Sequence, residues 1–199
     1  MNQEQVWDSL AESWNNFRQK VYEKGLYHLN WKKGKLLEIG CGNCRNLKLF
    51  KGFDLYGIDF SSEMLKYAKK FSNKYSLNIK LKKADMIKIP FKENYFDYIL
   101  NLASLHHLTK ENADKSLKEI YRVLKKNGQC FISVWNKYPK FIFHKKETYI
   151  EWKQKDKIYQ RYYYLYNSFE LKKLLIRDNF KILKSGKFFD KNLTFLIQK

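Results

Sequence analysis

The chain has 199 residues, of which 44% are hydrophobic and 18% aromatic, and its formal net charge is +20. A domain of this size buries about 70% of the surface that its unfolded chain exposes, which excludes intrinsic disorder and any need for disulfides or a structural metal. It has no apolar run near the ~18 residues of a membrane span and no signal-peptide core, and its three cysteines suit a reducing compartment, so we expect one cytoplasmic domain without a membrane anchor.

The positive charge has two interpretations. Only five of the 40 basic residues are arginine, so the lysine excess can reflect a coding bias. A positive field also attracts polyanions. Residues 101–199 carry a net charge of +13 against +7 for residues 1–100, so the C-terminal half is the expected polyanion face.

The first elements alternate between helix and strand. Apolar residues at helical spacing predict a helix over 6–23, and short apolar runs predict strands over 36–39 and 55–59. Residues 46–50 favour a short helix between these strands. Ser61 is expected to cap a helix that extends to about residue 75.

The alternation continues through the middle of the chain. Strands are predicted over 78–83, 96–102 and 130–135. An amphipathic helix is expected over 111–124, with Gly128 as the glycine that ends it. Five alternations of strand and helix are the pattern of a parallel, doubly wound α/β sheet.

The C-terminal elements break the parallel pattern. A capping box at 167–170 predicts a helix over 171–177. Strands over 180–184 and 193–197 follow without a helix between them, which implies an antiparallel pair. The parallel sheet is therefore expected to end in one reversed strand.

Glycines and acids follow three successive strand ends. The run Glu-Ile-Gly-Cys-Gly at 38–42 allows a tight turn and a close approach of the backbone to a ligand. Asp59 can accept hydrogen bonds from ribose hydroxyls, and Asp85 with Met86 can hold an adenine ring. Arg45 stands where a dinucleotide motif needs glycine, so the pattern favours S-adenosylmethionine. The predicted cofactor-binding residues are Glu38, Gly40, Cys41, Gly42, Asp59, Phe60, Asp85, Met86, Asn101 and Leu102.

These segments resemble the class I S-adenosylmethionine-dependent methyltransferases. The resemblance rests on residues 36–43, 57–59, 84–86, 96–99 and 119–125. It implies a Rossmann-like α/β fold with a seven-stranded sheet of order 3-2-1-4-5-7-6, strand 7 antiparallel, flanked by helices. One departure is Cys44, which replaces the usual third glycine of the loop.

The substrate side is expected to combine two segments of this single domain, a helical lid over 1–30 and an aromatic, lysine-rich insertion over 136–166 that ends in an extended segment, 159–166. A histidine after the fourth strand can donate to a substrate oxygen or act as a base, although His107 can equally be a packed core residue. Arginines kept in a lysine-rich chain indicate a need for the planar guanidinium at Arg18 and Arg161.

Four short motifs resemble the tRNA wobble-uridine carboxymethyl methyltransferases: residues 17–19, 106–107, 134–135 and 161–166. That family converts 5-carboxymethyluridine into its methyl ester and works with a small zinc-binding activator subunit. Tyr164 stands where the family signature has histidine. The resemblance implies catalytic residues Arg18, His106, His107, Arg161 and Asn192, and substrate-binding residues Trp135, Tyr162, Tyr163 and Tyr164.

The resemblance also implies tRNA as the macromolecular partner and the strand at 78–83 as the edge on which an activator would pair. Two other functions stay open: methylation of a small molecule, and RNA binding without catalysis. Cys41 and Cys44 have metal-like spacing but no second ligand pair, so no metal is expected.

Overall fold

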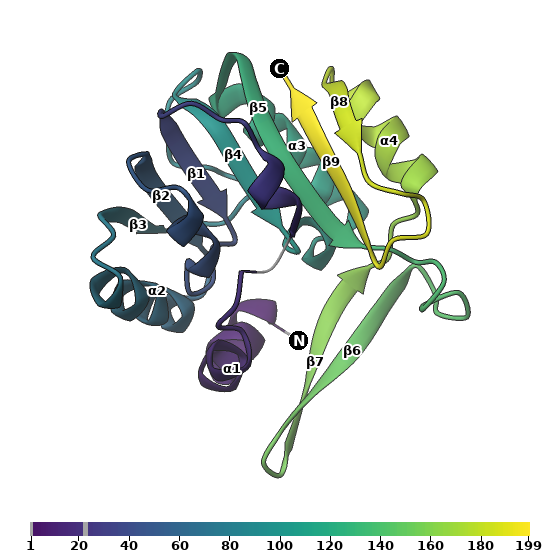
Figure 1. Cartoon of the computed structure of the whole chain (residues 1–199). Coiled ribbons are helices and arrows are strands. Elements are labelled where there is room, and N and C mark those ends of the chain that lie inside the picture. Colours follow the sequence, from purple (N-terminus) through teal and green to yellow (C-terminus); the bar gives the residue numbers. More distant parts are fainter. Residues whose placement is uncertain (1, 22–23) are drawn as a thin grey trace.

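The computed structural model describes residues 2–21 and 24–199, and a central sheet organises them (Figure 1). Its strands are β1 (Lys35–Ile39), β2 (Asp54–Asp59), β3 (Ile79–Lys83), β4 (Phe96–Leu102), β5 (Leu124–Trp135), β8 (Lys181–Ser185) and β9 (Asn192–Gln198). They lie in the order β3-β2-β1-β4-β5-β9-β8. Only β9 runs against its neighbours, so the predicted order and the reversed seventh strand are confirmed.

Helices form where caps and apolar spacing predict them. They are α1 (Gln3–Phe17), α2 (Ser62–Lys74), α3 (Lys110–Val123) and α4 (Ser168–Arg177), with three short 3-10 helices, η1 (Lys24–His28), η2 (Arg45–Leu49) and η3 (Leu105–His107). The Ser61 hydroxyl accepts a hydrogen bond from the Met64 amide, as expected of an N-cap. Among the described residues, no helix is long and apolar enough to cross a membrane.

The inner strand β1 is buried on both faces. In β1, Leu37 and Ile39 pack into one core cluster and Leu36 packs into another, and all three side chains are fully buried. This double burial is characteristic of a parallel sheet covered by helices on both sides. Because β1 runs parallel to β2 and β4, the carboxyl ends of these strands lie at the same end of the sheet, where the polar residues gather.

The insertion forms a hairpin of its own. Strands β6 (Glu147–Gln154) and β7 (Lys157–Tyr164) pair antiparallel in a separate two-stranded sheet. Figure 1 shows this hairpin and α1 side by side below the central sheet. The Trp152 indole donates to the Ser13 hydroxyl at 2.8 Å, and the Tyr162 amide donates to the Gln3 side chain at 2.9 Å, so the two segments are fastened together.

Three local predictions are wrong. Helix α1 ends at Phe17 and not at residue 23, because the Arg18 carbonyl accepts a hydrogen bond from the Asn43 side chain at 2.9 Å instead of continuing the helix. Residues 22 and 23 lie outside the described part. Helix α3 passes directly into β5 at the buried Leu124, so Gly128 does not end it, and Asn127 takes the left-handed φ of +63°. The extended segment is β7, which begins and ends two residues before the predicted range.

Candidate active site

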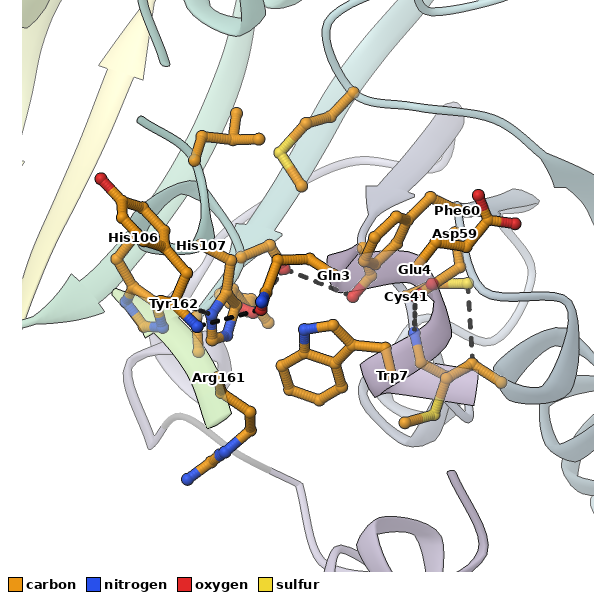
Figure 2. Close-up of a pocket in the computed structure, with 18 of the residues that line it drawn as sticks. Gln3, Glu4, Trp7, Cys41, Asp59, Phe60, His106, His107, Arg161 and Tyr162 are labelled. Carbon is orange, nitrogen blue, oxygen red and sulfur yellow. Dashed lines mark hydrogen bonds between the residues drawn. The ribbon is translucent and has the colours of Figure 1, made fainter. Parts of the chain in front are cut away.

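A cavity of about 610 Å³ lies at the carboxyl ends of β1, β2 and β4, and α1 and the hairpin cover it (Figure 2). We call it the active-site cavity. Most of the residues predicted from the sequence line it: Arg18, Glu38, Gly40, Cys41, Gly42, Asp59, Phe60, Asp85, Met86, Leu102, His106, His107, Trp135, Arg161, Tyr162 and Tyr163.

Three predicted residues do not line this cavity. Asn101 is fully buried, and its side-chain oxygen accepts from the Leu105 amide at 3.1 Å, so it shapes the turn into η3. Tyr164 packs in the main core and donates its hydroxyl to Glu170 at 2.6 Å, so its side chain does not reach the cavity. Asn192 lines a second, neighbouring cavity.

The loop after β1 depends on left-handed backbone positions. Gly40 and Gly42 have φ values of +63° and +53°, and a Cβ on Gly40 would lie 2.3 Å from the Ser104 hydroxyl oxygen. Cys44 also adopts a left-handed φ, +61°, where the resembling family has a glycine. The cysteine therefore keeps the loop shape at a cost in backbone strain of roughly 1–3 kcal/mol.

The three thiols of the chain are free and buried. Those of Cys41 and Cys44 both face Gly57, whose ideal Cβ position lies 3.1 and 3.2 Å from the two sulfur atoms. Among the described residues, no three His, Cys, Asp or Glu side chains come together in a group that could hold a metal ion.

Two buried acids form the cofactor side of the cavity. One carboxylate oxygen of Glu38 accepts from Asn46 at 2.6 Å, and the other is buried with no hydrogen-bond partner among the described residues. Asp59 accepts from the Gly42 amide at 2.8 Å and from the Ser61 amide at 3.0 Å. Burial raises the pKa of Glu38 to about 7 and that of Asp59 to about 6.

These acids fit a ligand that carries a cationic amine and sugar hydroxyls. The unpartnered oxygen of Glu38 can accept from an ammonium group, and the second lone pairs of Asp59 can accept from ribose. Met86 and Asp85 line the adjoining wall, as predicted for an adenine ring. The arrangement is therefore compatible with S-adenosylmethionine.

Both histidines of the cavity are neutral hydrogen-bonding groups. The ring Nδ1 of His107 donates to the Tyr162 carbonyl at 2.9 Å, which leaves Nε2 as an acceptor, and Nδ1 of His106 accepts from the Trp135 amide at 2.9 Å. Burial lowers the pKa of His107 to about 3 and the pKa of His106 well below its ordinary value. Neither ring supplies a positive charge at neutral pH.

Arg161 contributes a buried positive charge to the substrate side, and Arg18 lines the same cavity. The Arg161 side chain is buried, one guanidinium nitrogen donates to the Tyr163 hydroxyl at 2.9 Å, and the group lies 4.9 Å from the centre of the Trp152 ring. The Nε atom is buried without a hydrogen-bond partner, and no acid of the described part lies within ion-pair distance. Burial lowers the pKa of Arg161, the nearby charge of Arg18 lowers it further, and Tyr163 opposes the shift in part.

Trp7 also lines the active-site cavity, although the sequence analysis did not predict it. It lies on α1, 4.8 Å from the His107 ring, and Figure 2 shows it between the histidines and the cofactor loop. Its indole N–H is buried without a hydrogen-bond partner in the described part. The helical spacing that predicted α1 could not reveal it, because the same spacing describes an ordinary apolar face.

Trp135 is held in a stack of aromatic rings. It stacks on Phe141 at 5.4 Å and on Tyr163 at 4.6 Å, and Tyr163 in turn stacks on His106 at 5.0 Å. Because two protein rings already stack on it, Trp135 is poorly placed to stack on a substrate base. The stack instead fixes the position of the Tyr163 hydroxyl that binds Arg161.

Sequence comparison finds that the chain is similar to methyltransferases. Residues 37–132 match the family model described as "Methyltransferase domain". A relative named tRNA (carboxymethyluridine(34)-5-O)-methyltransferase, from Schizosaccharomyces pombe, is 28% identical over 92% of this chain and 90% of its own length. A relative of the same name from Arabidopsis thaliana is 29% identical over 65% of this chain but 31% of its own length. The chain spans 30% to 32% of the length of the mammalian relatives that it matches.

Solved structures show the same fold. A SAM-dependent methyltransferase from Aquifex aeolicus has a TM-score of 0.73 at 21% identity and covers 96% of this chain and 97% of its own. A methyltransferase from Haloferax volcanii, solved in complex with the Trm112 methyltransferase activator, has a TM-score of 0.72 at 13% identity over 99% and 96% of the two chains.

The pKa of Glu38 predicts how stability depends on pH. Because the folded pKa is about 7 and the ordinary value is 4.5, the protonated form stabilises the fold below pH 4.5, and this contribution is lost as the pH rises through 7. We expect the unfolding free energy of the cofactor-free protein, relative to that of Glu38→Gln, to fall by about 3 kcal/mol across this window. Urea unfolding at pH 5 and pH 8 measures the difference, and a constant difference would contradict the burial account.

Proposed function

We propose that this chain, which carries a class I S-adenosylmethionine-dependent methyltransferase domain, methylates the carboxylate of 5-carboxymethyluridine at the wobble position of tRNA. The observation that carries the proposal is the buried Arg161 guanidinium, which has no acidic partner in the described part of the chain. A buried charge is costly unless an opposite charge joins it. A carboxylate substrate would supply that charge, and the name of the Schizosaccharomyces pombe relative includes such a substrate.

The chemistry needs alignment more than proton transfer. S-adenosylmethionine supplies a methyl group whose carbon–sulfur bond breaks as the carboxylate oxygen–carbon bond forms, leaving S-adenosylhomocysteine and a neutral ester. A carboxylate is ionised at neutral pH, so no general base is required, which agrees with two histidines that stay neutral. Arg161 would hold and orient the carboxylate, the Trp7 indole would donate to it, and His107 Nε2 would accept from a base or sugar donor.

Polar contacts support a lid role for the N-terminal segment. Asp8 accepts from the Ser61 hydroxyl at 2.6 Å, and Glu4 pairs with Lys83 at 2.7 Å, which holds α1 over the cofactor side of the cavity. The contacts of Ser13 and Gln3 with the hairpin hold α1 over the substrate side of the cavity. We infer that α1 excludes water from the reaction and must move to admit ligands.

The hairpin is the proposed tRNA contact of this domain. Its turn and the adjoining strand ends carry the exposed Lys153, Lys155 and Lys157, and Tyr149 is 55% exposed beside Tyr162. Lysines can engage the RNA backbone and exposed aromatic rings can stack on unpaired bases. Such an RNA substrate and three free thiols are both compatible with the cytoplasm.

An activator subunit belongs to the same proposal. Strand β3 lies at the edge of the sheet, where a partner strand could pair with it. The Haloferax volcanii neighbour was solved with the Trm112 activator, which supports the expectation of an activator partner here. Lys80 and Lys83 on this edge form ion pairs with Asp54 and Glu4, so part of the edge charge is already neutralised.

A labelled-methyl transfer assay tests the proposed function. The full chain, with and without a Trm112-type activator, is incubated with S-adenosylmethionine and total tRNA lacking the ester. We expect label on a wobble uridine that mild base releases, because the product is a carboxylic ester. Label on a small organic acid and not on tRNA would favour the small-molecule alternative, and label on neither would contradict both.

Replacing Trp7 by phenylalanine tests the indole N–H. The ring contact with His107 is retained while one hydrogen bond to a charged group is lost, so we expect kcat/KM for the carboxymethyluridine RNA to fall about tenfold. Cofactor affinity should not change. The matched control is Trp31→Phe, which removes an indole N–H that binds Gln129 away from the cavity. Equal kcat/KM values in the two variants would show that the Trp7 N–H has no role.

A further inference from the structure

A second cavity of about 440 Å³ opens beside the active site. It is formed by the segment after α1, the end of β5 and the chain that leads into β9. Arg18, Arg45 and Trp135 line both cavities, so the two are contiguous. A ligand in the active-site cavity could therefore extend into the second one without leaving the protein surface.

The second cavity is strongly cationic. Of the described residues that line it, four are basic and none is acidic: Arg18, Lys20, Arg45 and Lys191 are the basic ones. Lys20 and Lys191 are exposed and are separated by most of the chain, so only the fold brings them to one cavity. Arg45 is buried, with its guanidinium 4.9 Å from the centre of the Trp14 ring, and adds a fixed positive charge behind them.

The position of these charges favours one ligand. A nucleotide whose base enters the active-site cavity must keep its 5′ and 3′ phosphodiesters at the cavity mouth, because extrusion of a base leaves the backbone outside. Lysine ammonium groups act as mobile point charges for phosphate, whereas a small acid substrate would have no second anionic group to reach them.

We propose that the second cavity binds a phosphodiester of the RNA backbone adjacent to the nucleotide that is methylated. Lys20 and Lys191 contact the phosphate, and Arg18, at the junction of the two cavities, lies between it and the reacting carboxylate. This inference rests on the proposed function for its RNA substrate, and it adds a binding site that positions the target nucleotide.

Charge removal at the two lysines gives the first test. The variant is Lys20→Ala/Lys191→Ala, and the matched control is Lys172→Ala/Lys173→Ala on the exposed face of α4. The probe is an anticodon stem-loop RNA that carries 5-carboxymethyluridine. We expect the Kd of the variant to rise at least fivefold, and the slope of log Kd against log salt to fall by ~0.7 for each lost phosphate contact. The control should change less than twofold.

Removing the charge from the RNA completes a double-mutant cycle. A methylphosphonate replaces the phosphodiester on the 5′ side of the modified uridine in one RNA and on the 3′ side in another. One of these neutral linkages should weaken binding to the wild-type chain by about the factor that the lysine variant loses, and should weaken binding to the variant little further. Equal losses in wild type and variant for both RNAs, or equal losses in the variant and the control, would overturn the proposal.

The same samples separate this inference from the proposed function. Methyl transfer to the native stem-loop is measured in parallel, with the activator present. Methyl transfer without energetic coupling between the two lysines and the neighbouring phosphodiester would overturn the inference and leave the proposed function standing. Coupling without transfer would contradict the proposed reaction and leave the backbone site standing.

Discussion

The proposed substrate side of the active-site cavity depends on one buried guanidinium group that has no anionic partner in the described structure. Arg161 is held by the Tyr163 hydroxyl and covered by the Trp152 ring, yet the described structure places no carboxylate within ion-pair distance of it. Removing an arginine from water is costly, and neutral hydrogen bonds repay only part of that cost. The hairpin, the lid helix and the aromatic stack from His106 to Phe141 together keep this charge in place.

The two halves of the active-site cavity have opposite electrostatic character. Glu38 and Asp59 are buried acids whose raised pKa values show that each lacks a full countercharge in the ligand-free protein. A cationic cofactor would relieve that cost on one side, and an anionic substrate would relieve the cost of Arg161 on the other. The neutral histidines line the same cavity and add to neither charge. This division would suit a positively charged methyl donor facing a negatively charged acceptor, as the proposed reaction requires.

The site residues that were predicted correctly follow from the strand topology. Those that were missed or misplaced depend on how side chains and distant segments pack. Parallel strands bring their carboxyl ends together, so Glu38, Asp59 and Asp85 could be assigned to one site from strand positions alone. That Tyr162 and Tyr163 line the cavity and Tyr164 does not depends on how β7 packs against the rest of the molecule, which the sequence pattern does not determine. The apolar spacing of α1 did not show that Trp7 lines the active-site cavity. Lys20 and Lys191 line one cavity only because segments far apart in the chain pack together.

The most direct test of the central claim compares a charged ligand with its neutral isostere. Stem-loop RNAs carrying 5-carboxymethyluridine or 5-carbamoylmethyluridine compete for the wild-type chain, for Arg161→Gln and for the remote control Arg177→Gln. If Arg161 is the carboxylate receptor, wild type and control prefer the acid by roughly 30-fold or more, as expected for a close buried charge pair, and Arg161→Gln loses most of that preference. An equal preference for the acid in all three proteins would contradict the account.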